Sequence, residues 1–462
     1  MEKAAAEPAT GPPPKAPPGY PPGCPPGRPP DAVSTRNTTV LVLFTSLTNL
    51  ADGVTKVALP LLATRFTRSP VLVSAVALTL TLPWLLAALH VGVLVDRYDR
   101  RRLLWIANTV RLAAVAALLG TTVTGTTTLS ALYLGGIALG VAEVVALTSA
   151  TALVPMAIAP GKLERANAWV AGAETVCNEF CGPFVGGLLV AAGASVALGA
   201  TGAAYVTGMA VLLLLAGRFA PRAAGDRPAG SVNQRIAEGL HLLWHQRLLR
   251  MTALALTVLC ACWGGWFALM PLMATGPMGL SAQQYGMLLS SLGAGGLVGA
   301  LTVGPLNRLL GRRRVMFADL LGTAAMMAAP VLTTNLWPVA ASAFVGGMGG
   351  VLWTVNSRTI GQRMVATELM GRYNAAARLF SWGAMPLGAG LAGVLAQWFG
   401  LRAAFAVFAG AALLVVVPFL RAVTPRALAE ATAYRDPKTR PVTGRSAGRG
   451  PGGAGRRARS RR

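Results

Sequence analysis

Twelve long apolar runs, separated by short polar stretches, limit most strongly what this chain can fold into. A membrane-spanning helix needs about 20 consecutive apolar residues, because its backbone polar groups must be bonded within the segment. The 462 residues are 54% hydrophobic and only 12% charged, against about 25% charged in an average soluble domain. We therefore predict an all-α integral membrane protein with twelve transmembrane helices. They are expected at residues 38–63, 71–95, 103–123, 129–153, 167–191, 195–217, 251–273, 284–306, 315–334, 336–357, 373–396 and 401–420.

These spans form two groups of six, which divide the chain into five predicted segments. Residues 1–36 are Pro-rich with few large apolar side chains, so we expect a disordered tail. Residues 37–217 and 251–422 are the predicted N-terminal and C-terminal six-helix halves. The linker at 218–250 holds apolar residues at helical spacing and predicts a cytoplasmic segment with an interfacial helix. The Arg-rich residues 423–462 predict a second disordered tail.

Lysine and arginine gather on one side of the predicted spans. The loops after the second, fourth, sixth, eighth and tenth spans hold 4+2+6+4+3, or 19 of them, and the opposite loops hold only Arg65, Arg68 and Arg402. By the positive-inside rule, both termini are expected in the cytoplasm, in a multi-pass protein of the cell (inner) membrane. The net charge of +25 lies in these loops and the tail rather than on one folded face, so no nucleic-acid partner is expected.

Two motifs recur in the two groups of spans. Gly92 to Arg102 follows the second span and Gly304 to Arg314 follows the eighth, with Arg97 and Arg308 separated by 308−97, or 211. At the starts of the fifth and eleventh spans, Asn167 and Asn374 are separated by 374−167, or 207. Near-equal offsets indicate a duplication, which is typical of transporters built from parallel repeats.

At these residues the chain resembles the major facilitator superfamily, whose loop between helices two and three reads G-x-x-x-D-R-x-G-R-R/K. Asp99 stands where the family usually has Gly, and the second copy has Asn307 for Asp. The matching residues are Gly92, Asp96, Arg97, Arg100 and Arg101, with Asn307 and Arg308 in the second copy. A carboxylate and cations at helix ends can pair and separate as the halves rock, so we interpret these residues as a conformational latch; the alternative is that the arginines only set the topology.

The fifth span holds a second resemblance. Gly182-Pro183-Phe-Val-Gly186-Gly187 is similar to the G-P-x-x-G-G element of exporters in the superfamily. Its small residues permit close helix packing, and the resemblance implies that this packing helps to seal the path. The linker and the eleventh span resemble the branch with the enterobactin exporter and macrolide-efflux proteins. The resemblance implies alternating access between the two halves.

Ionisable residues inside spans are costly, at about 2.5 to 3.5 kcal/mol each on insertion scales, and are therefore candidates for proton coupling. Asp52 and Lys56 are four residues apart and can neutralise each other on one helix face. Glu174 and Glu179 are five apart, roughly 140° around an α-helix, so one is expected to face the cavity and the other a neighbouring helix. In order of preference the carboxylates are Asp52, Glu179, Glu174 and Glu143; the basic candidates are Lys56 and Arg111. For each, a structural ion pair is an equal alternative.

Many proton-coupled drug exporters carry an arginine in the fourth helix where this chain has Gly136, and Arg111 in the third helix is a candidate replacement. Aromatic and other large side chains predict a broad, largely apolar substrate cavity, with lipid-facing or interfacial packing as the alternative for each Trp. The candidates are Trp84, Trp263, Trp266, Phe267, Met270, Trp353 and Asn356. No phosphate loop, zinc-ligand spacing or nucleophile motif is present, so we expect no cofactor, no metal and no enzymatic activity.

The sequence therefore predicts a monomeric secondary transporter in the lipid bilayer. Its expected partners are protons and a small organic substrate, either a drug, a siderophore or an amphipathic metabolite. We expect export by alternating access with proton antiport. The alternatives are a lysophospholipid transporter and a non-transporting membrane sensor or scaffold.

Overall fold

The computed structural model describes residues 31–217, 219, 238, 240–241, 243–365, 369–381 and 383–428, and all regular elements in these ranges are helices. Ten helical segments are long and apolar enough to cross a membrane, and α2 (Pro70–Leu86) and α15 (Ala384–Phe399) are shorter apolar helices. The all-α membrane class is thus confirmed. The count of twelve stays a prediction, because the expected spans at 71–95 and 373–396 are each divided into two helices.

The helices follow one another with short connections. The first group comprises α1 (Asp31–Phe66), α2, α3 (Ala88–Arg97), α4 (Arg100–Val123), α5 (Leu129–Ala157), η1 (Pro160–Lys162), α6 (Leu163–Glu174), the π-helix η2 (Thr175–Cys181), α7 (Gly182–Ala192) and α8 (Ala194–Leu213). The second comprises α10 (Arg247–Thr275), α11 (Ala282–Leu309), α12 (Arg312–Leu332), α13 (Leu336–Met364), α14 (Met370–Ser381), α15, α16 (Leu401–Leu414) and α17 (Val416–Ala422).

Three expected segment boundaries shift. The first helix begins at Asp31 rather than after residue 36, and the Ser34 hydroxyl accepts a 2.6 Å hydrogen bond from the Ala159 amide, which fixes this early turn. Helix α10 begins at Arg247, inside the expected linker. After α17 the Thr424 hydroxyl caps a further helical turn. The rest of both expected tails and most of the linker lie outside the described residues.

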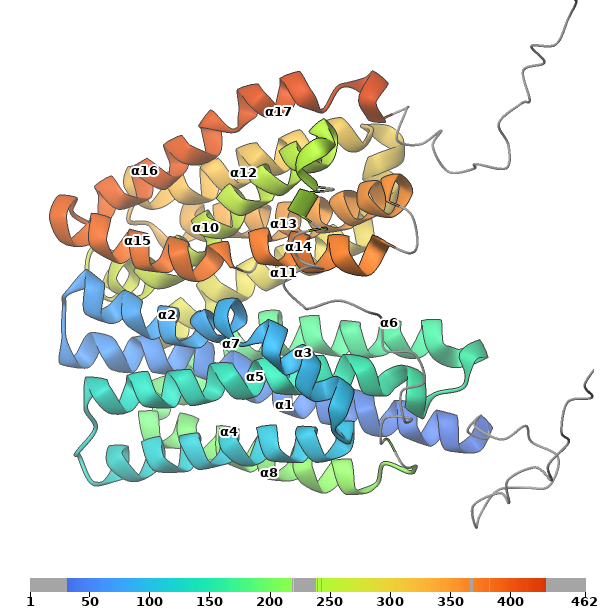
Figure 1. The fold of residues 1–462 in the computed structure, drawn as a ribbon. Helices are drawn as coiled ribbons and strands as arrows, with labels where there is room; N and C mark the ends of the chain where they lie inside the picture. The colour runs from blue at the N-terminus through green and yellow to red at the C-terminus, as the bar shows by residue number, and fades with distance from the viewer. Residues whose placement is uncertain are drawn as a thin grey trace, which may run out of the picture.

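The helices α1–α8 lie together on one side of the molecule and α10–α17 on the other (Figure 1). Most contacts between the two groups are made by α2 with α10 and α15, and by η2 and α7 with α11, and α1 adds fewer contacts with α10 and α11. The Ser69 hydroxyl donates to Gln397 Oε1 at 2.9 Å, near the end where α1 passes to α2 and α15 to α16 (left in Figure 1). We call this the closed end of the bundle.

Small residues bring helices together inside the second group. A Cβ atom on Gly347 of α13 would overlap the carbonyl of Leu292 in α11, and one on Gly264 of α10 would overlap the carbonyl of Met385 in α15. Because lipid supplies no hydrophobic force between helices, such close backbone approach is what gains van der Waals contact.

The duplicated arginine motif makes the same contact in both groups. Arg101 Nη2 donates to the carbonyl of Leu213 at the end of α8, and Arg313 Nη2 donates to the carbonyl of Leu420 in α17, both at 3.1 Å. The donors are separated by 313−101, or 212, and the acceptors by 420−213, or 207. Cations are favourable at helix C-termini, where carbonyls lack intrahelical partners.

A second pair of arginines repeats the pattern from the first helix of each group. Arg36 Nη2 donates to the carbonyl of Leu214 at 3.0 Å, and Arg247 Nη2 donates to the carbonyl of Arg421 at 3.4 Å. These donors are separated by 247−36, or 211, and the acceptors by 421−214, or 207. The sequence offsets of the duplication therefore reappear as matched contacts.

Candidate functional site

Three helices of the first group meet at a buried carboxylate. Asp52 of α1 forms an ion pair with Arg111 of α4, with 3.1 Å between Asp52 Oδ2 and Arg111 Nη2. The Tyr205 hydroxyl of α8 donates to Asp52 Oδ1 at 2.7 Å, and the Arg111 guanidinium lies 5.7 Å from the centre of the Tyr205 ring. All three residues are buried. Both carboxylate oxygens are thus satisfied, as a buried charge requires.

One turn further along α1, Lys56 forms a second ion pair. Its Nζ atom lies 3.1 Å from Oε1 of Glu179, which belongs to η2. Unlike the first pair, these side chains remain 33% and 39% exposed. This pair is therefore more accessible than the pair of Asp52 and Arg111.

These contacts correct the expected neutralisation of Asp52 by Lys56. The two side chains lie on one face of α1, but Asp52 reaches α4 and α8 whereas Lys56 reaches η2. Spacing along one helix shows which side chains are neighbours, but the helices packed against that face supply the partners. The two ion pairs still act on each other, since Asp52 contributes to the electrostatic environment of Lys56.

Glu143 of α5 belongs to the same group of charges. It lies close enough to Asp52, Lys56, Arg111 and Glu179 to interact electrostatically with each. We call the side chains of Asp52, Lys56, Arg111, Glu143, Glu179 and Tyr205 the charge cluster. Four of the six expected ionisable residues make direct ion pairs here, and Glu143 adds a third carboxylate.

The π-helix η2 overturns the expected separation of Glu174 and Glu179. A π-helix closes i→i+5 hydrogen bonds, so residues five apart come close to one face instead of lying roughly 140° apart. Glu174 accordingly interacts electrostatically with Glu179 and Lys56. No pattern in the sequence distinguishes this stretch from a regular α-helix.

The wide turn of η2 is held against α1. The Asn178 side-chain amide donates to Asn49 Oδ1 at 2.9 Å, and a Cβ on Gly53 would lie 2.7 Å from the Asn178 carbonyl oxygen. π-helical turns are frequent at functional sites. Here the turn places Glu179 beside Lys56.

The Gly-Pro element that follows η2 packs against two helices. A Cβ on Gly182 would lie 2.7 Å from the Gly53 Cα atom, and one on Gly186 would lie 3.0 Å from the Val54 Cα atom, both in α1. Gly187 faces the other group of helices, at Gly286 of α11. Pro183 follows η2 within a continuous helical stretch, where it removes a backbone N–H donor. The element therefore joins the two groups near the closed end.

The expected latch is described only in part. The Asp96 side chain lies outside the described residues, and the Arg97 and Arg308 side chains are exposed. Gly92 has open space around its Cα atom. Arg100 Nε and Asn307 Oδ1 are buried without a hydrogen-bond partner in the described part of the chain.

Asp99, the departure from the family pattern, caps α4. Its Oδ1 atom accepts hydrogen bonds from the amides of Arg101 at 2.9 Å and Arg102 at 3.1 Å. In the second copy Gly311 holds the corresponding cap position with φ of +80°. The first turn thus uses a side-chain cap and the second a left-handed glycine.

The position that carries an arginine in many proton-coupled exporters has no room for one here. A Cβ on Gly136 would overlap the Thr79 hydroxyl of α2. The buried cation of the cluster comes instead from Arg111.

The expected cavity residues lie in two kinds of environment. Trp84, Trp263 and Phe267 are partly exposed, and the Trp263 and Phe267 rings lie 6.1 Å apart. The other four, Trp266, Met270, Trp353 and Asn356, are at most 1% exposed. In this conformation these four pack in helix interfaces, and a role in lining the cavity stays a prediction.

One buried carboxylate is not among the residues predicted from the sequence. Asp319 of α12 is 2% exposed, and neither oxygen has a hydrogen-bond partner among the described residues. A Cβ on Gly349 of α13 would overlap Asp319 Oδ1, so this glycine makes room for the carboxylate. Because Asp319 lies only five residues after Arg314, its position in the sequence suggests the end of the helix. Its carboxylate nevertheless lies deep in the helix bundle. Within the described ranges, no three His, Cys, Asp or Glu side chains gather as metal ligands do.

Comparison with known proteins identifies the family. A model of the transmembrane secretion effectors, a family of major facilitator proteins, matches residues 34–444. The multidrug efflux pump Tap of Mycobacterium tuberculosis is 32% identical over 394 residues, covering 80% of this chain and 90% of the relative. The chain is a transmembrane secretion effector of the major facilitator superfamily. The Tap pump of Mycolicibacterium fortuitum is 30% identical over 398 residues, covering 80% of this secretion effector and 92% of the pump.

Solved structures show the same fold. A point mutant of the nucleoside transporter NupG matches with a TM-score of 0.68 at 12% identity, covering 84% of this secretion effector and 100% of that chain. A bacterial homologue of the iron transporter ferroportin in an inward-facing state matches with a TM-score of 0.64 at 17% identity, covering 84% and 98%. Family and relatives together support a multi-pass membrane efflux transporter.

Proposed function

We propose that this secretion effector exports amphipathic, drug-like organic molecules in exchange for protons. The ion pair of Lys56 with Glu179 carries the proposal, because it is a charged pair within the helix bundle that remains partly exposed. Ionisable groups at membrane depth are typically parts of substrate or proton pathways. The names of the Tap relatives, as multidrug efflux pumps, support drug-like compounds as the first substrates to test.

The proposed exchange of substrate for protons rests on the different surroundings of the two ion pairs. Glu179 has one cationic partner and an exposed face, whereas Asp52 is buried and bonded to both Arg111 and Tyr205. Glu179 is therefore the better group to take up a proton, and it replaces Asp52 as our first choice. A protonated Glu179 releases Lys56, and this changes the net charge that a bound substrate meets by one unit. Asp52 and Arg111 keep α1, α4 and α8 in place during this change.

The conformation of the helices fits a stage of transport in which one end of the bundle is closed. The contacts of α2 with α15 and of α7 with α11 lie toward the closed end, where the predicted spans leave few arginines. With the predicted orientation this end faces outward. We propose that a substrate for export reaches the charge cluster from the opposite, cytoplasmic end in this conformation.

Transport into inverted membrane vesicles tests the proposal. We expect a cationic fluorescent drug to accumulate in vesicles that carry the protein, and the accumulation to disappear when a protonophore collapses the proton gradient. Glu179→Gln should abolish this gradient-dependent part. Glu164→Gln is the matched control, because Glu164 is exposed at the start of α6.

Two outcomes would favour the alternatives. Gradient-independent movement of a labelled lysophospholipid would favour a lipid transporter. A protein that moves no compound of a broad panel of drugs and siderophores, and whose cellular effect depends on residues 1–30 and 429–462, would favour a sensor or scaffold.

A further inference from the structure

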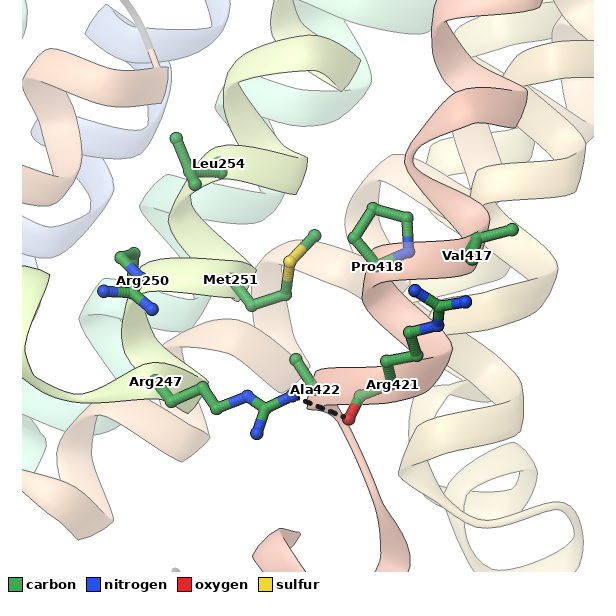
Figure 2. A pocket seen from close by; sticks show the side chains of 8 residues that line it. All are labelled: Arg247, Arg250, Met251, Leu254, Val417, Pro418, Arg421 and Ala422. Atoms are coloured by element: carbon green, nitrogen blue, oxygen red, sulfur yellow. Dashed lines mark hydrogen bonds between the residues drawn. The ribbon is translucent and has the colours of Figure 1, made fainter.

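We propose that a cavity between α10 and α17 binds the phosphate headgroup of an anionic phospholipid. The cavity has a volume of about 300 Å³ and opens at the N-terminal end of α10 (Figure 2). Three arginines and several apolar side chains line it. The residues that carry the argument are Arg247, Arg250, Arg421, Met251, Leu254 and Val417.

Three arginines among the lining residues give the cavity a positive charge. Within the described part of the chain, none of them contacts a carboxylate, and Arg421 makes no side-chain hydrogen bond. Arg247 donates to the backbone carbonyl of Arg421, and Arg250 donates to the backbone carbonyl of Trp244 at 3.2 Å. A phosphate diester offers the negative charge and the acceptor oxygens that these donors lack.

The internal repeat has no counterpart in the first group for two of these arginines. Arg247 caps the last helix of its group, as Arg36 does in the first group. The offsets of 211 and 207 place Thr39 opposite Arg250 (250−211) and Leu214 opposite Arg421 (421−207). The same helix junction in the first group therefore lacks both additional cations. Arg247 has this capping role and Arg250 bonds the Trp244 carbonyl before α10, whereas the Arg421 side chain bonds no carbonyl in the described part of the chain.

The apolar part of the cavity fits an acyl chain. Leu254 is 37% exposed and lies one turn beyond Arg250 in α10, and Val417 is 53% exposed and lies one turn before Arg421 in α17. Trp244 stands beside Arg250, with 5.9 Å between the guanidinium carbon and the ring centre, and is 47% exposed. Tryptophan at this depth is typical of the membrane–water interface. Basic pockets between transmembrane helices on the cytoplasmic side are suited to anionic headgroups.

Charge excludes the chain's own C-terminal segment as the occupant. Residues 429–462 contain many arginines and only two acidic residues, Glu430 and Asp436. A free phosphate ion would use the three arginines but gain nothing from Leu254 and Val417. The apolar side chains favour the lipid.

Native mass spectrometry of the purified full-length protein tests the site. We expect dioleoyl phosphatidylglycerol to be retained over phosphatidylcholine, and the triple variant Arg247→Gln, Arg250→Gln, Arg421→Gln to lose affinity by roughly fivefold per arginine, since each basic residue contributes about 1 kcal/mol near an anionic surface. The control is Arg165→Gln, Arg314→Gln, Arg358→Gln, which removes the same charge from exposed positions at the same predicted side. Equal losses in the two triple variants would overturn the proposal.

A second variant keeps the charges and fills the groove. Val417→Trp should weaken phosphatidylglycerol binding while leaving the arginines in place, and it also serves if the triple variant does not fold. Inorganic phosphate is the competing probe. If phosphate at millimolar concentration displaces the lipid completely, or if Val417→Trp binds lipid as the unchanged protein does, the site is for a soluble anion and the lipid proposal fails.

Discussion

A Cβ atom on Gly187 would lie 2.9 Å from the Cα atom of Gly286, and one on Gly286 would lie 2.8 Å from the Cα atom of Gly187. The backbones of α7 and α11 therefore touch where the two groups of helices meet. Neither backbone can yield as a flexible side chain would, so this contact exists only while both positions are glycine. It lies toward the closed end.

Alanine at either glycine should open the closed end. Overpacking of this kind costs roughly 1–3 kcal/mol, and separation of α7 from α11 relieves it. We expect Gly187→Ala and Gly286→Ala each to lower the yield of a disulfide crosslink between cysteines placed at Ser69 and Gln397. Gly199→Ala, with open space around it, should leave the yield unchanged. An unaltered yield in both test variants would show that the contact does not hold this end shut.

Arg111→Gln should destabilise the fold strongly. It leaves the Asp52 carboxylate buried without its cation, which costs about 3–5 kcal/mol in comparable pairs. Tyr205→Phe removes one hydrogen bond to a charged group and should cost about 1.5–3 kcal/mol. Thermal unfolding in detergent measures both. The double variant Asp52→Asn, Arg111→Gln should recover part of the loss, and full additivity of the single effects would contradict the ion pair.

Lys56→Gln should leave stability nearly intact while impairing export. Partly exposed ion pairs contribute about 1 kcal/mol or less, and Lys56 and Glu179 are both exposed by a third or more. We expect a small change in melting temperature together with a several-fold fall in gradient-dependent drug accumulation. A melting shift as large as that of Arg111→Gln, with normal export, would make the pair structural instead.

Gly349 and Asp319 should be coupled. Gly349→Ala places a methyl group onto the Asp319 carboxylate, so we expect a clear loss of thermal stability. In an Asp319→Ala background the same glycine substitution should cost much less, because the space is then free. Residues in contact commonly show coupling energies of about 0.5–3 kcal/mol in such double-mutant cycles. If the effects of the two substitutions were additive, the Asp319 carboxylate would not contact Gly349.

Asp99 offers a test of its role as the cap of α4. Asp99→Ala should cost about 1 kcal/mol, because two amides of the first turn lose their acceptor, whereas Asp99→Gly, which restores the usual family residue, should cost only a few tenths. The rate of hydrogen exchange at the backbone amides in the first turn of α4 should rank the two variants in the same order. Equal losses for the two substitutions would argue against a capping role.

Much of the fold could be predicted from the sequence. The apolar runs locate the helices because each span needs its own length of apolar residues, and the repeated arginine motifs indicate a duplication that returns as matched helix caps at Arg101 and Arg313. The glycines of the Gly-Pro element pack as small residues should. Each of these features is encoded by residues that are close to one another in the sequence.

The site was harder to predict because its partners come from different helices. The sequence singles out Asp52 and Lys56 as charges within an apolar run, but their partners Arg111 and Glu179 depend on which helices pack against α1. The π-helical turn at 175–181 has no sequence signature that we could read. Asp319 was missed because its significance lies in burial and in the absence of a partner among the described residues, and neither follows from its position in the chain.

The π-helix η2 also determines which side of α7 each of its residues lies on. A turn closed by i→i+5 bonds holds one residue more than a regular turn, and each residue of an α-helix advances its face by about 100°. If the same residues formed a regular α-helix, α7 would thus be turned by more than a quarter of a revolution. Val185 would then take the place of Gly186 at Val54, and Gly187 would leave Gly286. One extra residue in one turn therefore keeps the meeting of the two groups in register.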